Sequence, residues 1–258
     1  MAVTGEALKS ESATIRIFES SEDLARAAAE ECVRLALDAA KARARFSIAL
    51  AGGSTPKRLY ALLASEQDNS FRSRFPWQET HFFWGDERHV PPDHADSNYR
   101  MALETMLSKV PVAPSQLHRI KSETLDAAKA ALDYEEDLLQ YFHLTRGLWP
   151  RFDLALLGLG PDGHTASLFP ETEVLDEKTR LAAAVWVPKF QTWRITLTAP
   201  LLNHAAHVLF LVSGKDKAEA LRAVLKGDLE PRRFPGQLIQ PVQGSRQWLV
   251  DRDAASLL

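Results

Sequence analysis

The sequence predicts a single-domain α/β protein built as three layers, α/β/α, around a mainly parallel, Rossmann-like sheet. Apolar, strand-like runs alternate with helix-like segments along the whole chain, which favours successive βαβ units. Residues 206–214 (AHVLFLVSG) are apolar without alternation, as expected of a strand covered on both faces. The 258 residues contain no repeat and no low-complexity linker. We therefore expect one domain over 1–258, with a frayed N-terminus at 1–13.

In the first half of the chain, capping signals and apolar spacing mark the elements. Ser21 begins an alanine-rich amphipathic pattern that predicts a helix to about Arg43. Ser54 or Thr55 is the expected N-cap of a second helix, with Pro56 in its first turn. The other segments are predicted as strands at 14–20, 45–53, 79–87 and 116–120, and as helices at 96–110 and 124–143.

The second half continues the alternation. Strands are expected at 152–159, 182–188, 206–214 and 246–255, and residues 193–205 as a strand running into a helix. A helix is predicted at 215–227, ending at Gly227, and His164 is expected at the start of another. Residues 231–241 (PRRFPGQLIQP) are typical of a surface loop.

Composition excludes several classes of function. The formal charge of -3, from 34 acidic and 31 basic residues, predicts no general attraction to nucleic acid or to an anionic membrane. No apolar run approaches the roughly 20 residues that span a bilayer, and the first residues lack a signal-peptide core. Cys32 is the only cysteine, which excludes a disulfide framework, and we expect it to be buried. These features predict a soluble, cytoplasmic protein.

Ligands of open parallel sheets bind beyond the carboxyl ends of the strands, and four loops qualify here. The first is 50–56 (LAGGSTP), where Gly52 and Gly53 allow a tight turn. Ser54 and Thr55 then add hydroxyl groups at a helix N-terminus, where free N–H groups favour an anion. A plain turn with an N-cap is the alternative, and the G-K-[ST] ending of a Walker loop is missing.

The second loop, 82–98 (FFWGDERHVPPDHADSN), carries three charges directly after an apolar strand. Arg88 suits bidentate recognition of a phosphate or carboxylate. Asp86 and Glu87 could orient Arg88 or take part in acid–base chemistry, and a solvated loop with internal ion pairs is the alternative. The spacing of His89 and His94 matches no metal motif, so no metal site is predicted.

The third loop lies in 154–170 (LALLGLGPDGHTASLFP). Its glycines at 158, 160 and 163 match G-x-G-x-x-G, but the acidic residue that a dinucleotide site places after a second strand is not clear. Asp162 precedes His164 by two residues, so its carboxylate can hold one imidazole tautomer. An imidazole titrates near pH ~6.5, which lets His164 accept a proton at neutral pH. A hydrogen-bonded structural histidine is the alternative.

The fourth loop, 212–221 (VSGKDKAEAL), places Lys217 near a helix N-terminus, where a lysine opposes the helix dipole. A bound phosphate would offset that charge, and an exposed surface lysine is the alternative. Arg194 (QTWRITLT) has the same two interpretations, as an anion ligand or as part of a structural ion pair. Taken together, these loops predict a small anionic substrate, held by its phosphate and acted on by a general base.

With these residues in view, the chain resembles the 6-phosphogluconolactonase family of the glucosamine/galactosamine-6-phosphate isomerase-like superfamily. The motifs AGGSTPKRLY, FFWGDERHVPPDHADSNYR, LLGLGPDGHTASLFP, RITLT and VSGKDKAEAL occur in the family's order, over about 15–250. The resemblance implies a deaminase/isomerase-like fold and hydrolysis of 6-phospho-D-glucono-1,5-lactone to 6-phospho-D-gluconate in the oxidative pentose phosphate pathway. It implies no organic cofactor and no required metal. The partner is then a small phosphosugar lactone, bound by a monomer or a small homo-oligomer.

Roles follow from the same resemblance. His164 would act as the general base on water, and Asp162 would orient it. Arg88 would either hold the phosphate or stabilise the oxyanion, and Asn98 would fix the second loop or touch sugar hydroxyls. The remaining candidates are expected to bind the substrate or its phosphate: Gly52, Gly53, Ser54, Thr55, Asp86, Arg194 and Lys217.

Two other functions stay open. A glucosamine-6-phosphate deaminase/isomerase shares similar loops, but its D-G-H-I-A-F-N-E-P segment has a glutamate where this chain has Phe169, and it has a tyrosine in place of Arg88. Phe169 has no acid–base capacity, which favours hydrolysis. A non-catalytic sugar-phosphate sensor is the third possibility, but the residues before the first strand are too few for a helix-turn-helix.

Overall fold

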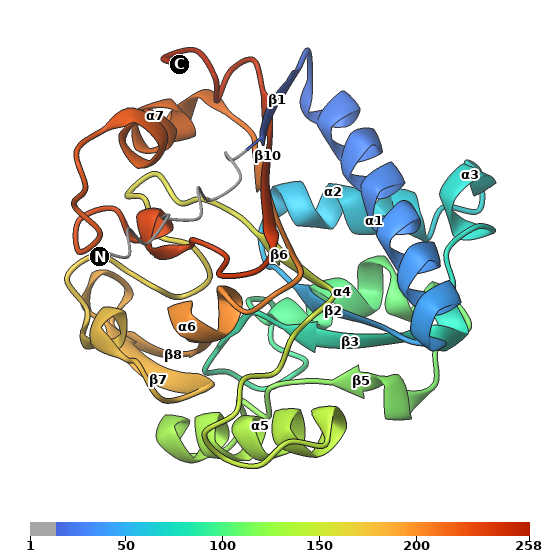
Figure 1. The fold of residues 1–258 in the computed structure, drawn as a ribbon, viewed down its shortest axis with the longest axis horizontal. Coiled ribbons are helices and arrows are strands. Elements are labelled where there is room, and N and C mark those ends of the chain that lie inside the picture. The colour runs from blue at the N-terminus through green and yellow to red at the C-terminus, as the bar shows by residue number, and fades with distance from the viewer. Residues whose placement is uncertain (1–13) are drawn as a thin grey trace, which may run out of the picture.

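A computed structural model describes residues 14–258, so the predicted frayed segment 1–13 lies outside the described residues. A seven-stranded sheet forms the centre, in the order β1-β10-β9-β6-β2-β3-β5 (Figure 1). All six neighbouring pairs are parallel. The strands are β1 (Thr14–Phe18), β2 (Phe46–Leu50), β3 (Thr80–Trp84), β5 (Leu117–His118), β6 (Leu154–Leu157), β9 (His207–Val212) and β10 (Ser245–Asp251).

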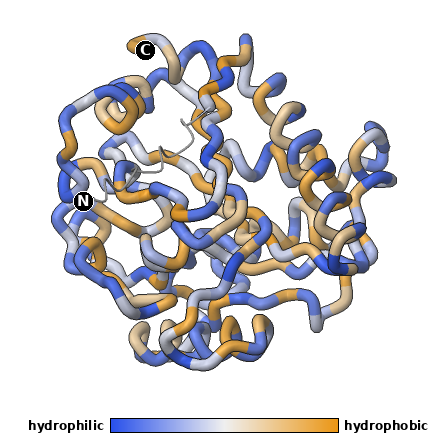
Figure 2. Tube along the Cα trace, in the orientation of Figure 1, coloured by the Kyte–Doolittle hydropathy of each residue, from blue (hydrophilic) through white to orange (hydrophobic). Residues whose placement is uncertain are grey.

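The middle strands are buried on both faces because they are apolar throughout. Every residue of β2 and β6 is buried, and so is every residue of β9 after His207. Figure 2 shows hydrophobic and hydrophilic colours alternating along the peripheral helices, as in helices with one buried face. The α/β class predicted from the alternating pattern is confirmed.

Helices lie on both sides of this sheet. In Figure 1, α1 and α2 lie on one side, and α7 lies on the other. The helices are α1 (Ser21–Arg43), α2 (Ser54–Leu63), α3 (Asn69–Arg72), α4 (Asn98–Thr105), α5 (Ala127–Phe142), α6 (Ala199–Leu202) and α7 (Ala218–Lys226). The predicted bounds of α1 are confirmed, with Ser20 as its N-cap accepting from the Asp23 amide. Cys32 on α1 is buried, as predicted, and burial raises the pKa of its thiol.

A second sheet corrects the expectation that all strands share one sheet. β4 (Asp86–Arg88), β8 (Thr192–Leu197) and β7 (Ala182–Val187) form an antiparallel sheet in the order β4-β8-β7. The predicted strand 79–87 breaks at Gly85, whose amide donates to Leu50 O while its carbonyl accepts from Leu197 N. The chain therefore leaves the central sheet at Gly85 and pairs with β8.

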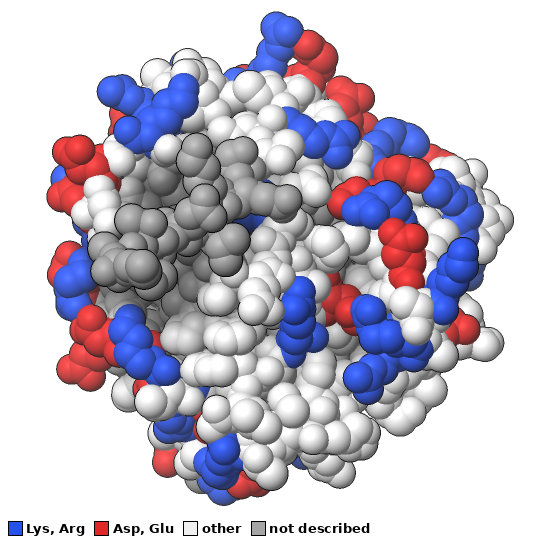
Figure 3. All heavy atoms as spheres, viewed as in Figure 1, with Lys and Arg blue, Asp and Glu red and all other residues white. Residues whose placement is uncertain are grey.

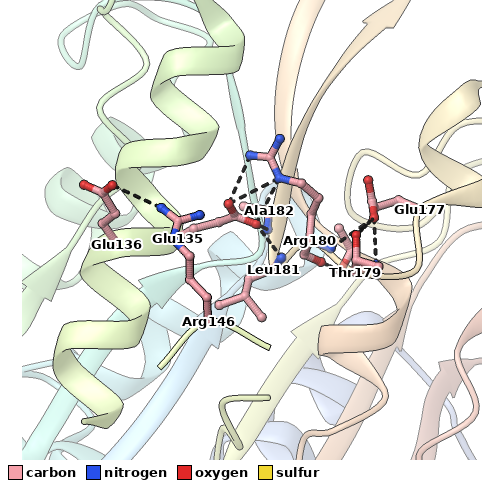
Figure 4. Close-up of polar contacts among 9 residues, drawn as sticks. Glu135, Glu136, Arg146, Glu177, Thr179, Arg180, Leu181 and Ala182 are labelled. Atoms are coloured by element: carbon pink, nitrogen blue, oxygen red, sulfur yellow. Dashed lines mark hydrogen bonds and ion pairs between the residues drawn. The ribbon is translucent and has the colours of Figure 1, made fainter. Parts of the chain in front are cut away.

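Helix α5 packs on β7 and β8 and is fastened there by a buried carboxylate. Glu135 accepts hydrogen bonds from the Leu181 amide (2.6 Å) and the Arg180 guanidinium (3.0 Å), as Figure 4 shows. Its side chain is 6% exposed, so the ion pair is largely shielded from water. This contact fixes the start of β7 against the helix and so holds the small sheet in place.

The prediction of a helix at His164 is wrong. Turns follow His164, with an isolated bridge between Thr165 and Leu168. Gly163 and Ala166 have φ values of +78° and +47°, in the left-handed region that a right-handed helix cannot contain. Hydrogen bonds within the loop, such as Thr165 Oγ1 to Gly158 O, replace those of a helix.

Three further expectations need correction. Residues 231–241 are not purely a surface loop, because they contain a buried 3₁₀ turn at Pro235–Leu238, and Ile239 is fully buried. The N-cap of α2 is Gly53, whereas Ser54 and Thr55 are already helical and provide no side-chain cap. The predicted helix 215–227 is a 3₁₀ turn at Lys215–Lys217 followed by α7.

The surface carries charges of both signs. Figure 3 shows Lys and Arg interspersed with Asp and Glu on the face in view. No helix within residues 14–258 has the length and apolar character needed to cross a membrane.

Candidate active site

The loops after four adjacent strands meet at one edge of the central sheet. The strands β9, β6, β2 and β3 are neighbours and parallel, so their carboxyl ends lie side by side. The order changes direction at β2, the type of position where open α/β sheets bind ligands. A pocket of about 290 Å³ opens there. All predicted site residues except Asp162 line it: Gly52, Gly53, Ser54, Thr55, Asp86, Arg88, Asn98, His164, Arg194 and Lys217.

The turn between β2 and α2 presents backbone to this pocket. Gly53 has a φ of +100°, a conformation that favours glycine, and the helix begins at Ser54 with no side-chain cap. A Cβ atom at Gly52 would overlap the carboxamide of Asn98. The two glycines therefore serve different purposes: Gly53 turns the chain, and Gly52 lets Asn98 approach. The uncapped N–H groups of α2 are suited to an anion.

Two arginines face the same pocket from the small sheet. Arg88 on β4 and Arg194 on β8 are directly paired across the strands, so their side chains share one face. The Nε atoms of both side chains are buried, and within residues 14–258 neither has a hydrogen-bond partner. Burial and the neighbouring Arg88 lower the pKa of Arg194. Two like charges with unpaired donors form a site that favours a bound anion.

Asp86 connects three loops at the floor of the pocket. Its Oδ2 accepts from Ser167 Oγ (2.6 Å), and its backbone O accepts from Asn98 Nδ2 (2.9 Å). Only 8% of Asp86 and none of Ser167 is exposed. Asp86 thus joins the histidine loop to helix α4 and so stabilises the shape of the pocket.

Glu87 accepts a hydrogen bond from the Arg88 amide (2.8 Å) and caps helix α4. It accepts from the amides of Asn98 (2.7 Å) and Tyr99 (2.8 Å) and from the Ser97 hydroxyl (3.0 Å). Burial raises the pKa of Glu87, and the hydrogen bonds from the amides of Tyr99, Asn98 and Arg88 oppose the shift. Acid–base chemistry by Glu87 was one open possibility, but its carboxylate is occupied by the helix N-terminus and does not line the pocket.

His164 and Asp162 form a hydrogen-bonded pair. Asp162 Oδ1 lies against Nδ1 of His164, and its Oδ2 accepts from Lys189 Nζ (3.1 Å). Burial alone would raise the pKa of Asp162, but the hydrogen bonds from His164 and Lys189 outweigh it and hold that pKa well below its usual range. The ionised carboxylate favours the imidazole tautomer with its proton on Nδ1, in which Nε2 is an acceptor.

Glycines shape the backbone around this pair. A Cβ atom at Gly160 would overlap Nδ1 of His164, so only glycine lets the imidazole lie against the loop. At Gly163 a Cβ atom would come within 2.9 Å of Phe234 Cδ1, and Gly163 O accepts from Gly236 N (2.9 Å). Residues 231–241, which were predicted to be a surface loop, thus pack against the histidine loop.

Lys217 completes the set of cations at the pocket. It lies at the end of the 3₁₀ turn before α7, with its side chain 23% exposed. Its Nζ is 2.8 Å from Asp216 Oδ2, an exposed partner that a substrate could replace. The prediction that Lys217 lies near a helix N-terminus and faces the pocket agrees with this placement.

Sequence reasoning missed several residues of the pocket. Ser167 and Phe190 line it, and Lys189 pairs with Asp162. None of the three has a local sequence signal, and Lys189 and Phe190 lie on the tight turn between β7 and β8. Within residues 14–258 no group of three or more His, Cys, Asp or Glu side chains is arranged to hold a metal ion. His89 instead contacts the Thr124 carbonyl, at 2.7 Å from Nε2.

Comparison with known proteins gives a consistent picture. A profile described as glucosamine-6-phosphate isomerases/6-phosphogluconolactonase matches residues 19–248. A 6-phosphogluconolactonase of Synechocystis is 43% identical over 216 residues, covering 84% of this chain and 86% of its own. The human 6-phosphogluconolactonase is 40% identical, covering 95% and 93%.

Solved structures agree. The 6-phosphogluconolactonase of Trypanosoma brucei superposes with a TM-score of 0.84 at 29% identity, covering 96% of this chain and 99% of that one. A monomeric glucosamine-6-phosphate deaminase superposes with a TM-score of 0.76 at 22% identity, over 95% and 100% of the two chains. The deaminase comparison shows a shared fold, while the two curated relatives share a large part of the sequence as well.

Proposed function

The chain belongs to the family of glucosamine-6-phosphate isomerases and 6-phosphogluconolactonases, and on that premise we propose that it hydrolyses 6-phospho-D-glucono-1,5-lactone to 6-phospho-D-gluconate. The observation that carries the proposal is that one pocket holds both a histidine–carboxylate dyad and two arginines whose buried Nε atoms have no hydrogen-bond partner within residues 14–258. A phosphorylated ester needs both: a base for water and cations for the phosphate.

The base is His164. With Nδ1 held by Asp162, Nε2 takes a proton from a water molecule as its oxygen attacks C1 of the lactone. The resulting tetrahedral intermediate collapses by breaking the bond between C1 and the ring oxygen. The proton on Nε2 then passes to the ring oxygen, so the histidine returns to its starting state. General catalysis of this kind typically contributes 10²–10⁴-fold.

The phosphate is held by the cations and the α2 turn. Arg88 and Arg194 provide guanidinium donors from adjacent strands, and the uncapped N-terminus of α2 adds backbone N–H groups. Lys217 supplies a further ammonium group at the pocket wall. The direct pairing of Arg88 with Arg194 favours a phosphate role for both over an oxyanion role for Arg88.

Phe169 favours hydrolysis over aldose–ketose isomerisation. Its ring is buried, at 5% exposure, and packs against His164 with a centroid distance of 4.1 Å. The position where the deaminase motif has a glutamate is thus filled by an apolar ring, which cannot shuttle protons between substrate carbons.

The place of action and the assembly state belong to the same proposal: a cytoplasmic enzyme, monomeric or a small homo-oligomer, whose partner is a phosphosugar lactone. The balanced charge of -3 supports a small-molecule partner over nucleic acid. Light scattering after gel filtration measures the assembly state, and cell fractionation measures the location.

The test follows the lactone itself. Fresh lactone made from glucose 6-phosphate should disappear faster with the protein than in its absence, and His164→Ala should lose at least 100-fold in kcat, on the order expected for a general base. The variant should still bind 6-phosphogluconate in calorimetry. Unaccelerated lactone decay with the wild-type chain would falsify the proposed activity. Near-normal turnover by His164→Ala would instead show that another group is the base.

A further inference from the structure

The ring of Phe169 lies almost parallel to the imidazole of His164. The two centroids are 4.1 Å apart, and the planes differ by 26°. Aromatic pairs attract one another beyond simple burial, at centroid distances of roughly 4.5–7 Å. This pair is slightly closer than that range, so the two faces are in firm contact.

The other constraints on His164 act on its edge. Asp162 Oδ1 lies against Nδ1, and a Cβ atom at Gly160 would overlap Nδ1 and Cε1. Both contacts are on the Nδ1 side of the ring, and the torsion about the Cβ–Cγ bond has broad minima, so a ring stacked on the imidazole face adds a further restraint on its rotation. Phe169 is the aromatic ring that contacts the imidazole face within residues 14–258.

Phe169 is itself held from behind. The ring of Phe190 meets it edge-on, with centroids 5.8 Å apart and planes at 76°. The Arg194 guanidinium lies 5.6 Å from the centroid of Phe190. The imidazole is therefore backed by buried Phe169, whose ring meets the partly exposed Phe190 of the turn between β7 and β8.

We propose that Phe169 is a positioning residue: its ring fixes the rotation of the His164 imidazole so that Nε2 faces the attacking water. This inference rests on the proposed function, because it takes His164 as the base. A misplacement of about 1 Å in a catalytic group can cost on the order of 100-fold in rate. Loss of the ring should therefore lower kcat by roughly 10- to 100-fold while KM stays within about twofold, since Phe169 supplies no polar group to the phosphate.

The experiment compares Phe169→Leu with two variants. Phe169→Tyr keeps an aromatic ring and should restore kcat to within a few-fold of wild type. Phe152→Leu is the matched control: Phe152 is fully buried and packs on Phe83 and Phe142, outside the pocket. It should lose stability as a buried Phe-to-Leu change does, yet keep its kcat.

A second measurement reads the histidine directly. Two-bond ¹⁵N–¹H spectra, with His164 assigned by comparison with His164→Ala, should show one neutral tautomer with the proton on Nδ1 in wild type and in Phe169→Tyr. In Phe169→Leu the two ring nitrogens should move toward averaged shifts, because the imidazole rotates away from Asp162 for part of the time.

The outcomes separate cleanly. A kcat for Phe169→Leu equal to that of Phe152→Leu overturns the inference, and so does an unchanged tautomer spectrum. If His164→Ala retains turnover, His164 is not the base, and that part of the proposed function is wrong. If His164→Ala is inactive and Phe169→Leu has a normal kcat, His164 can still be the base, and only the inference about Phe169 is wrong. A low kcat with unchanged KM, averaged nitrogen shifts and rescue by tyrosine supports the inference.

Discussion

At the scale of single residues, the pocket brings two arginine side chains together without pairing all of their hydrogen-bond donors. Arg88 and Arg194 are adjacent, and their buried Nε atoms lack partners among the described residues. Unsatisfied buried donors cost stability, and under the proposed function a bound phosphate would supply the missing acceptors. The nearby carboxylates accept their hydrogen bonds from other groups: Asp86 from Ser167 and Asn98, and Glu87 from the N-terminus of α4.

Inorganic phosphate should therefore stabilise the folded chain. At ten times its dissociation constant, a ligand that binds only the folded state adds about 1.4 kcal/mol. For a chain of this size, that corresponds to a rise in Tm of roughly 3–6 °C. Thermal unfolding with and without phosphate measures it, and chloride at equal ionic strength is the control.

Arg194→Met should abolish most of that rise, since methionine keeps an apolar stem without a charge. The same variant should raise KM for the phosphorylated lactone more than 10-fold and leave the slow hydrolysis of unphosphorylated gluconolactone unchanged. A loss of rate on both substrates alike would assign Arg194 to the oxyanion instead.

At the scale of elements, strand β4 and helix α4 are joined by one buried carboxylate. Glu87 follows Asp86 on β4 and accepts hydrogen bonds from the first turn of α4, where the helix dipole also favours a negative charge. The alternation of a strand sends Asp86 and Arg88 to the pocket and Glu87 to the opposite face. Strand β4 thus places two side chains in the pocket, and its third side chain holds helix α4.

Glu87→Gln should destabilise the protein by about 2 kcal/mol, because the amide loses the charge and turns an NH₂ group toward backbone donors. Glu104→Gln is the matched control: Glu104 lies on α4 with its side chain 60% exposed, and among residues 14–258 it pairs with Arg100 alone, so its loss should be small. Urea unfolding of both variants measures the difference. Equal effects would show that Glu87 is no cap.

At the scale of the whole molecule, two half-buried histidines make stability depend on pH. Burial lowers the pKa of His81, with His118 and Arg45 acting in the same direction, and burial also lowers the pKa of His207. Between the folded value and the unfolded value near ~6.5, the unfolded chain binds more protons. Stability therefore falls as pH drops below about 6.5, by at most about 1.4 kcal/mol per pH unit for each proton.

Urea unfolding at pH 7.5 and 5.5 should show this loss, and His81→Gln should reduce it. The difference between wild type and variant isolates the histidine, because Glu87, whose pKa is raised, acts in the opposite sense at lower pH in both proteins. An identical pH dependence in the two proteins would contradict the assignment.

Much of the site could be predicted from the sequence because its residues lie directly after apolar strands. Parallel strands place these loops at one edge, so His164, Arg88 and the Gly52–Thr55 turn were expected to meet. The helix expected after Gly163 was wrong, since left-handed residues such as Ala166 cannot be distinguished from helical ones by composition. Arg194 and Phe190 reach the pocket from a separate sheet that no local periodicity reveals.

The sequence by itself determined the alternation of strands and helices, the parallel sheet and the residue types at its carboxyl edge, because periodicity, capping and glycine chemistry act over a few residues. Only the tertiary structure decided that Asp86 joins the loops of the pocket and that Glu87 caps α4. It also decided that Arg88 lies beside Arg194 and that Phe169 covers His164. Those facts depend on contacts between segments far apart in the chain, such as β4 with β8, and packing sets such contacts only once the whole chain has folded.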